Sequence, residues 1–389
     1  MRGTLRRSLA ACAALAMMSV PCAMAEETPE EMLSTMTLRE KVGQLFVIRP
    51  EALSVDASGN RVSGGSQAVN EAMQSAYATY PAGGFCIFSD NIVSPKQLKY
   101  FIGCLKDLGR IEPIISVDEE GGRVLRVASN SQFGLEKTAN MASIGKTGDV
   151  EQARQAGEYI GSYLAEYGFN LDFAPVADVL TNPNNAVIGN RSFGSDPQLV
   201  ADMDAAYIEG LHRWSINACV KHFPGHGDTS GDTHKGLVAV KKTWRDLLTT
   251  ELVPFMRNFD ATDAVMVAHI SLENVTGSKY PASLSKTIIT DLLRRELGYD
   301  GVVITDALEM GAIQEKLKSD EAAILAFEAG ADLLLMPANF TRAFNGILSA
   351  VESGRISEER VNESVLRILR MKLGRRKAEA GLVESGWPE

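Results

Sequence analysis

The chain has 389 residues, of which 45% are hydrophobic and 23% charged, the composition of an ordinary globular protein. Its formal net charge of −10 at pH 7 argues against a nucleic acid or an anionic membrane surface as partner. This length allows more than one domain, but an α/β barrel can use most of it as one.

The N-terminus has the three parts of a signal peptide. Three arginines in the first seven residues precede the apolar stretch 8–20, which is too short to span a bilayer, and Ala23-Met24-Ala25 forms a small-x-small cleavage site. We expect residues 1–25 to be a signal peptide and the protein to be exported, periplasmic or extracellular, without a stable membrane anchor. An uncleaved signal anchor is the alternative. The cysteines left after cleavage are Cys86, Cys104 and Cys219, an odd number that does not suggest a disulfide framework.

Short apolar, β-rich runs alternate with amphipathic helical patterns along the rest of the chain. The predicted strands are 43–48, 84–88, 113–117, 171–176, 218–220, 264–268, 301–304 and 331–336. The clearest helical patterns are 94–108, 151–167, 197–214, 244–259, 286–297, 320–329 and 360–373. Buried strands that alternate with helices predict an α/β fold, a (β/α)₈ barrel of the TIM type.

We assign residues 26–374 to this barrel as a single catalytic domain, and 375–389 to a polar C-terminal tail. A doubly wound open sheet is the alternative, but no Gly-x-Gly-x-x-Gly turn follows the first strand.

Polar residues follow five of the predicted strands at their carboxyl ends, where barrels hold their active sites. They are Asp118, Asp178, Lys221 with His222, His269 and Asp306. In a closed barrel these residues form one ring, which predicts an active site at this end.

Asp306 follows the seventh strand as a lone carboxylate. One interpretation is a helix N-cap, for which Asp is well suited. The other is a carboxylate that faces the barrel axis and attacks an electrophilic carbon.

The segment 221–234 holds three of the five histidines and follows the fifth strand. Asp232 and His234 stand two residues apart, so in an extended segment their side chains share a side, and the carboxylate can hold the imidazole as a general acid/base. A solvated pair in a loop is the alternative. His222 and His226 have the spacing of a zinc pair on a helix, but Pro224 and the glycines around it exclude a helix. We expect no metal and no other cofactor.

Asp118 and Arg126 flank the run 119–125, whose paired glycines permit close approach of the backbone. An acid and a forked cation together can bind vicinal hydroxyl groups of a sugar. Arg191, in the loop after the fourth strand, offers a second guanidinium. A structural ion pair at the barrel rim is the alternative.

The segment 221–229 (Lys-His-Phe-Pro-Gly-His-Gly-Asp-Thr), followed by Asp232 and His234, resembles the signature of the β-N-acetylhexosaminidase branch of family-3 glycoside hydrolases. The segments 118–126, 171–176, 189–193 and 301–310 fit the same family in order and spacing. The resemblance covers nearly the whole chain after residue 25.

The resemblance implies a retaining hydrolase that forms a covalent glycosyl-enzyme and removes terminal β-linked N-acetylglucosamine. Asp306 would be the nucleophile, and His234 the acid/base with Asp232 as its partner. The residues that would bind the sugar are Asp118, Arg126, Arg191, Lys221 and His222. Most retaining glycosidases use two carboxylates, so the His–Asp pair is a departure that this branch is known for.

The expected partner is an oligosaccharide or muropeptide substrate, that is, a peptidoglycan fragment or a chitooligosaccharide. The alternatives are a phosphorylase of the same sugar, a β-glucosidase, and an exported sugar-binding barrel without catalysis. The sequence does not give the oligomeric state, and a monomer is compatible with it.

Overall fold

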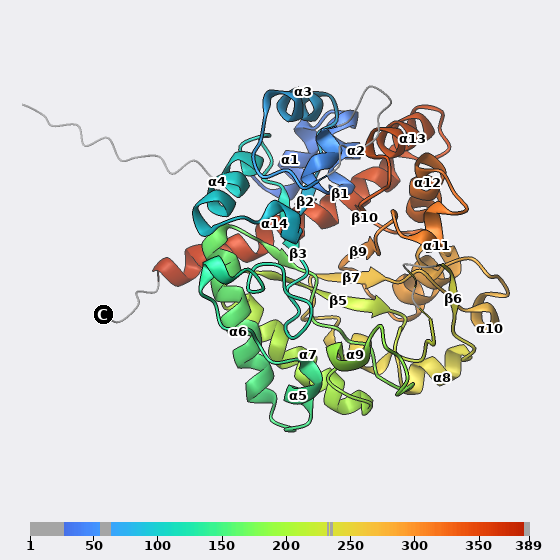
Figure 1. Ribbon diagram of the computed structural model, residues 1–389. Helices are drawn as coiled ribbons and strands as arrows, with labels where there is room; N and C mark the ends of the chain where they lie inside the picture. Colours follow the sequence, from blue (N-terminus) through green and yellow to red (C-terminus); the bar gives the residue numbers. More distant parts are fainter. Residues whose placement is uncertain (1–26, 55–63, 232, 234–235, 385–389) are drawn as a thin grey trace, which may run out of the picture.

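Parallel strands form the centre of the molecule and helices surround them (Figure 1). The computed structural model describes residues 27–54, 64–231, 233 and 236–384. The strands of the main sheet are β1 (Phe46–Ile48), β2 (Gly84–Cys86), β3 (Ile114–Val117), β4 (Leu171–Asp172), β5 (Asn217–Phe223), β7 (Ala264–Val267), β9 (Val302–Thr305) and β10 (Leu334–Leu335). Every residue of these strands is buried, because one face meets the barrel interior and the other meets the helices.

The sheet closes on itself. The strand order is β10-β1-β2-β3-β4-β5-β7-β9, and all neighbours are parallel. The two end strands meet through a parallel bridge between Ile304 and Leu333, where the main-chain N–H of Thr305 donates to Leu333 O at 3.0 Å. The predicted (β/α)₈ barrel and its eight strands are confirmed.

Most of the helices follow one another around the barrel in chain order (Figure 1). The helices are α1 (Pro29–Thr35), α2 (Leu38–Gln44), α3 (Glu71–Thr79), α4 (Pro95–Lys106), α5 (Met141–Gly145), α6 (Val150–Tyr167), α7 (Pro197–His212), α8 (Trp244–Thr249), α9 (Val253–Asn258), α10 (Glu273–Thr276), α11 (Gly311–Gln314), α12 (Ser319–Ala329), α13 (Phe340–Glu352) and α14 (Glu358–Glu384). A π-helical stretch, Thr287–Glu296, precedes β9.

Local sequence sets the helix ends. α6 begins where the side chain of Asp149 accepts from the N–H of Glu151, and it ends at Gly168, whose φ of 92° is a left-handed conformation that glycine adopts without strain. α4 begins at a Ser94 cap followed by a proline, a pair that suits a first helical turn.

Several predicted elements differ from the structure in their bounds. α14 continues to Glu384, so most of the predicted polar tail 375–389 belongs to this helix. The predicted helix 244–259 is split into α8 and α9, because Pro254 stands in the first turn of α9 and has no N–H for a continuous helix. The predicted strand 171–176 is only Leu171–Asp172, since Pro175 cannot donate to the ladder, although Val176 forms an isolated bridge with Lys221. A second small sheet, β6 (Val238–Ala239) with β8 (Ile270–Ser271), was not predicted.

α14 packs against α1, α2 and β9 and covers the amino end of the barrel. Its Lys372 donates to Gln44 Oε1 at 2.7 Å and to Gly83 O at 2.8 Å, just before β1 and β2. Burial lowers the pKa of Lys372 to about 7. This end is therefore filled by side chains, and the opposite end is left for the site. Within the described residues, no helix is both long and apolar enough to cross a bilayer.

Candidate active site

The carboxyl ends of the strands surround a cavity of about 220 Å³. Each predicted site residue that the structure describes lines it: Asp118, Arg126, Arg191, Lys221, His222 and Asp306. Asp232 and His234 lie outside the described residues. The strand-end ring therefore becomes one site in the fold, built from β3, β5, β9 and the loops that follow them.

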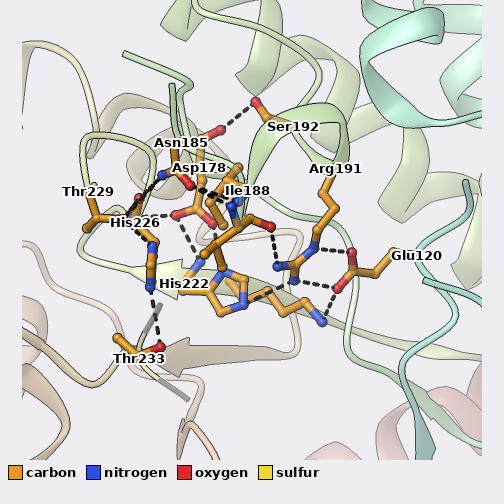
Figure 2. A network of polar contacts seen from close by, with 12 residues as sticks. Glu120, Asp178, Asn185, Ile188, Arg191, Ser192, His222, His226, Thr229 and Thr233 are labelled. Carbon is orange, nitrogen blue, oxygen red and sulfur yellow. Dashed lines mark hydrogen bonds and ion pairs between the residues drawn. The ribbon is translucent and has the colours of Figure 1, made fainter. Parts of the chain in front are cut away.

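An ion network forms the floor of the cavity. Lys221 Nζ, on β5, lies 2.7 Å from Asp118 Oδ1 and 2.5 Å from Glu120 Oε1, and the Lys221 and Glu120 side chains are each 2% exposed. Glu120 also accepts twice from Arg191, from Nε and from Nη2 at 2.8 Å each (Figure 2). A planar guanidinium matches a carboxylate in this two-bond geometry, so Arg191 is fixed in orientation.

The network holds its members charged. Burial alone would raise the pKa of Glu120, but the cations of Arg191 and Lys221 outweigh burial and hold that pKa far below its usual range. Burial would likewise lower the pKa of Lys221, yet Asp118 and Glu120 raise it above the ordinary value. These buried side chains are therefore already charged, and they can bind polar groups of a ligand without a change of protonation state.

Arg126 stands beside this floor. Its Nη2 lies 3.6 Å from Asp118 Oδ2, and its guanidinium carbon lies 5.4 Å from the centre of the Phe88 ring. The ion pair expected at the rim is present, and both of its side chains also line the cavity. The pair can contact a ligand as well as support the loop.

His222 is held from behind by Asp178. Its Nδ1 lies 2.7 Å from Asp178 Oδ2, and its Nε2 lies 3.4 Å from Arg191 Nη2 (Figure 2). Because the guanidinium can only donate, we assign the proton to Nδ1 and the lone pair to Nε2. Burial raises the pKa of Asp178, but His222 and His226 outweigh it and lower that pKa.

The two histidines of the zinc-like spacing are engaged separately. The His226 Nδ1 lies 2.8 Å from Thr229 Oγ1 and its Nε2 lies 3.5 Å from Thr233 Oγ1, while His222 contacts Asp178. Burial, with the neighbouring His222, lowers the pKa of His226, which favours the neutral ring. Among the residues that the structure describes, no group of three or more possible ligands is placed to hold a metal ion.

Asp306 lies at the end of β9 and is half-buried. Its main-chain N–H donates to Val267 O at 2.9 Å, and its Oδ1 accepts from the N–H of Ala307 at 2.8 Å. The next helix, α11, begins at Gly311 with Met310 as its N-cap, so Asp306 does not cap that helix.

His269, two residues after the end of β7, contacts this turn. Its Nε2 lies 2.9 Å from Ala307 O and its Nδ1 lies 2.6 Å from Ser283 Oγ, and the residue is fully buried. His269 was expected in the ring of site residues, but it is not among the described residues that line the cavity, and it contacts the Asp306 turn through Ala307 O.

Two further polar residues contribute to the site without having been assigned to it. Glu120 was not predicted as a site residue, although it stands two residues after Asp118, the spacing that places side chains on one side of an extended segment. Asp178 was predicted at a strand end but without a role. Apolar side chains also line the cavity, among them Phe88, Phe173, Val187, Ile188, Met266, Met310 and Met336.

This combination suits a neutral ligand rich in hydroxyl groups. Carboxylates can accept from hydroxyls, guanidinium and ammonium groups can donate to them, and apolar walls can cover the faces of a ring. Asp306 adds a carboxylate able to act as a nucleophile.

A protein-family comparison agrees with this chemistry. Residues 37–371 match the model of the glycosyl hydrolase family 3 N-terminal domain. The chain belongs to glycosyl hydrolase family 3. The resemblance seen in the sequence is thereby confirmed.

Among curated members of the family, the chain is 35% identical over 370 residues to the β-hexosaminidase LpqI of Mycobacterium tuberculosis, covering 91% of this chain and 87% of the relative. It is 33% identical over 322 residues to the β-hexosaminidase A of Pseudoalteromonas piscicida, covering 75% of this chain. The chain spans only about half of that second relative, 53% of its length.

A family 3 β-N-acetylglucosaminidase from Paenibacillus sp. str. FPU-7 has a similar structure, with a TM-score of 0.79 and 39% identity. That match covers 89% of this chain and 64% of the other. The structure of LpqI from M. tuberculosis matches with a TM-score of 0.75 and 32% identity, covering 89% of this chain and 96% of that one.

Proposed function

We propose that this protein is a retaining exo-β-N-acetylglucosaminidase. It would hydrolyse terminal β-linked N-acetylglucosamine from peptidoglycan fragments or chitooligosaccharides. The observation that carries the proposal is that the Asp306 carboxylate lines the same cavity as the network of Asp118, Lys221, Glu120 and Arg191. The names of the family relatives, β-hexosaminidase and β-N-acetylglucosaminidase, support the choice of sugar.

In the first half of the proposed reaction, the Asp306 carboxylate attacks the anomeric carbon while the bond from that carbon to the glycosidic oxygen breaks. His234 gives its proton to the departing oxygen. In the second half, His234 takes a proton from water, and the water oxygen displaces Asp306 from the sugar. Two displacements at one carbon give retention of configuration.

The other side chains of the cavity bind and orient the sugar in this scheme. Lys221 and Arg191 donate to its oxygens, and Asp118 accepts from its hydroxyls. His222 would contact the sugar from the cavity wall, with Nδ1 facing Asp178 and Nε2 beside the Arg191 guanidinium. Asp232 would keep His234 in one tautomer and raise its basicity.

The nucleophile is tested with 4-nitrophenyl N-acetyl-β-glucosaminide. Asp306→Asn should lose turnover, and proton NMR of the wild-type reaction should show the β-anomer first. The matched control is Asp300→Asn, because the Asp300 side chain is 82% exposed and pairs with Arg367 on α14, which covers the opposite end of the barrel. Unchanged activity of Asp306→Asn, or an α-anomer first, would reject this mechanism.

The substrate is tested by product analysis with GlcNAc-β-1,4-anhydroMurNAc and chitobiose, each in buffers with and without phosphate. Free N-acetylglucosamine in both buffers supports hydrolysis, whereas the sugar 1-phosphate would indicate a phosphorylase. A higher rate on 4-nitrophenyl β-glucoside would indicate a β-glucosidase, and binding without turnover a non-catalytic barrel.

We also propose that the protein acts after export, in a periplasm or outside the cell. The basis is the pattern of residues 1–25 described above. A mature N-terminus at Glu26 on the exported protein would support this, and an intact N-terminus on a cytoplasmic protein would contradict it.

A further inference from the structure

The chain between β5 and α8 contains two described stretches, which we call the outgoing and the returning stem. The outgoing stem, residues 224–229, follows β5, and the returning stem, residues 238–242, contains β6. Asp232 and His234 stand between the two stems in the sequence. The stems are therefore the supports of the segment that carries the proposed acid/base.

The outgoing stem is fastened to the loop that follows β4. The Asp178 carboxylate accepts from the main-chain N–H of His226 at 2.6 Å, and Asn185 Nδ2 donates to His226 O at 2.8 Å. Asn182 Nδ2 donates to Thr229 O at 3.0 Å. The returning stem is fastened through β6, which pairs with β8, and through Val240 N, which donates to Ser271 O at 2.9 Å.

Lys242 connects the two stems. Its Nζ, on the returning stem, lies 3.6 Å from Asp228 Oδ1 on the outgoing stem and 3.3 Å from Thr181 Oγ1. It also forms a close ion pair with Glu251 Oε1, and the Lys242 side chain is 24% exposed. Thr181 Oγ1 in turn lies 3.3 Å from Asp228 Oδ1 and 3.1 Å from Glu251 Oε1.

Glu251 is the buried member of this clamp, by which we mean Thr181, Asp228, Lys242 and Glu251. It stands in the break between α8 and α9, and its side chain is 0% exposed. Its Oε2 has no hydrogen-bond partner among the described residues. A buried carboxylate needs a paired cation, so Glu251 draws Lys242 inward and fixes the returning stem.

The outgoing stem also touches Glu251 directly. A Cβ added to Gly225 would lie 2.6 Å from Glu251 Cβ, so the backbone of the stem runs against this side chain. Glu251 therefore contacts one stem by packing and the other through its ion pair with Lys242.

We infer that Lys242 and Glu251 are positioning residues of the reaction. They set the separation of the two stems, between which Asp232 and His234 stand in the sequence, and through it they act on the proton transfer that we propose for His234. This inference rests on the proposed function. Neither residue lines the cavity, and their effect is expected on proton transfer rather than on attack by Asp306.

The test uses the full chain with Lys242→Met, and aryl N-acetyl-β-glucosaminides whose leaving groups differ in basicity. A 2,4-dinitrophenolate leaves without a proton, whereas a phenolate needs the general acid. We expect kcat/KM for the phenyl substrate to fall at least about tenfold more than for the dinitrophenyl substrate, because general acid catalysis contributes about 10²–10⁴-fold. Lys242→Arg, which keeps the cation, should recover most of the difference.

Lys241→Met is the matched control, since this neighbouring lysine side chain is exposed. Equal losses on both substrates, or no loss, would overturn the inference while leaving the proposed function standing. If the wild-type protein turned over none of the N-acetylglucosaminides, the proposed function would be rejected instead. A urea-unfolding curve for each variant shows whether a loss of activity comes from a folding defect. If Lys242→Arg restores kcat/KM for the phenyl substrate, its free energy of unfolding must be like that of the wild type.

Discussion

Asp178 binds His222 at two points. Its Oδ2 lies 2.7 Å from the ring Nδ1, and its Oδ1 accepts from the main-chain N–H of the same residue at 3.3 Å. The carboxylate thus fixes both the position of the backbone and the tautomer of the ring. With Asp178 ionised, the ring proton therefore stays on Nδ1, and the Nε2 lone pair faces the Arg191 guanidinium.

Asp178→Asn should weaken substrate binding. An amide NH₂ facing Nδ1 would move the ring proton to Nε2, opposite the donating guanidinium of Arg191. A charged hydrogen bond contributes about 1.5–3 kcal/mol, so we expect kcat/KM to fall roughly 10–100-fold. Steady-state kinetics measure this, and a double-mutant cycle with His222→Ala supplies the check. Additive losses would contradict action through His222.

Glu120→Gln should destabilise the fold, because it removes the carboxylate that the buried Lys221 and Arg191 cations both contact. Removing one partner of a buried ion pair costs about 3–5 kcal/mol. Urea unfolding at pH 7 measures the loss, and Glu352→Gln, an exposed helical residue, is the control that should show little change.

The effect of Glu120 also depends on pH. Its folded pKa lies below the ordinary 4.5, so its contribution is complete above pH 4.5 and is lost as the pH falls through the folded value. The difference in the free energy of unfolding between the wild type and Glu120→Gln should therefore become smaller as the pH falls below 4.5. A gap that stays constant into strong acid would contradict this account.

Gly227→Ala should disrupt the outgoing stem. A Cβ at this position would lie 1.9 Å from Val179 O, in the backbone next to Asp178, so the two segments must separate. We expect a lower melting temperature and loss of most activity. Gly103→Ala on α4 is the matched control, because its Cβ meets no heavy atom within 4 Å and should stabilise the helix by up to about 1 kcal/mol. Similar behaviour of both variants would refute the close-contact argument.

Much of the fold could be predicted because the barrel strands are continuous apolar runs between amphipathic helices. The hydrophobic pattern did not predict the effect of single prolines. Pro254 divides a predicted helix into α8 and α9, and Pro175 shortens β4. The strands β6 and β8 have only two residues each, too few for any period to be visible.

The strand-end rule indicated which end of the barrel holds the site, but not how deep each side chain lies. Asp118 and Asp306 line the cavity. His269 does not, and its ring contacts Ser283 instead. Glu120 was missed because its role depends on Arg191, which comes from a loop far along the chain. Such long-range pairing is set by tertiary packing and leaves no local pattern.

Asp204 provides a test of the buried scaffold beneath the site. It lies on α7 with a relative exposure of 0%, and neither carboxylate oxygen has a hydrogen-bond partner within the described part of the chain. Burial, and then the negative charge of Asp178, raise its pKa well above 3.8. In the unfolded chain the same group ionises at its ordinary pKa.

Because the folded pKa of Asp204 is raised, its stabilising contribution is complete below pH 3.8 and is lost as the pH rises through the folded value. Between the two values, the stability of the wild type should lose about 1.4 kcal/mol per pH unit from this group. Asp204→Asn removes that slope, so the free energy of unfolding of the variant should gain on that of the wild type as the pH rises above 3.8 toward the folded pKa of Asp204.

Urea unfolding at several pH values measures this difference. Asp202→Asn, whose side chain on the same helix is 48% exposed, is the control and should follow the wild-type curve. Parallel curves for wild type and Asp204→Asn would mean that Asp204 titrates alike in both states, and the account of a neutral, buried carboxyl under the site would be wrong.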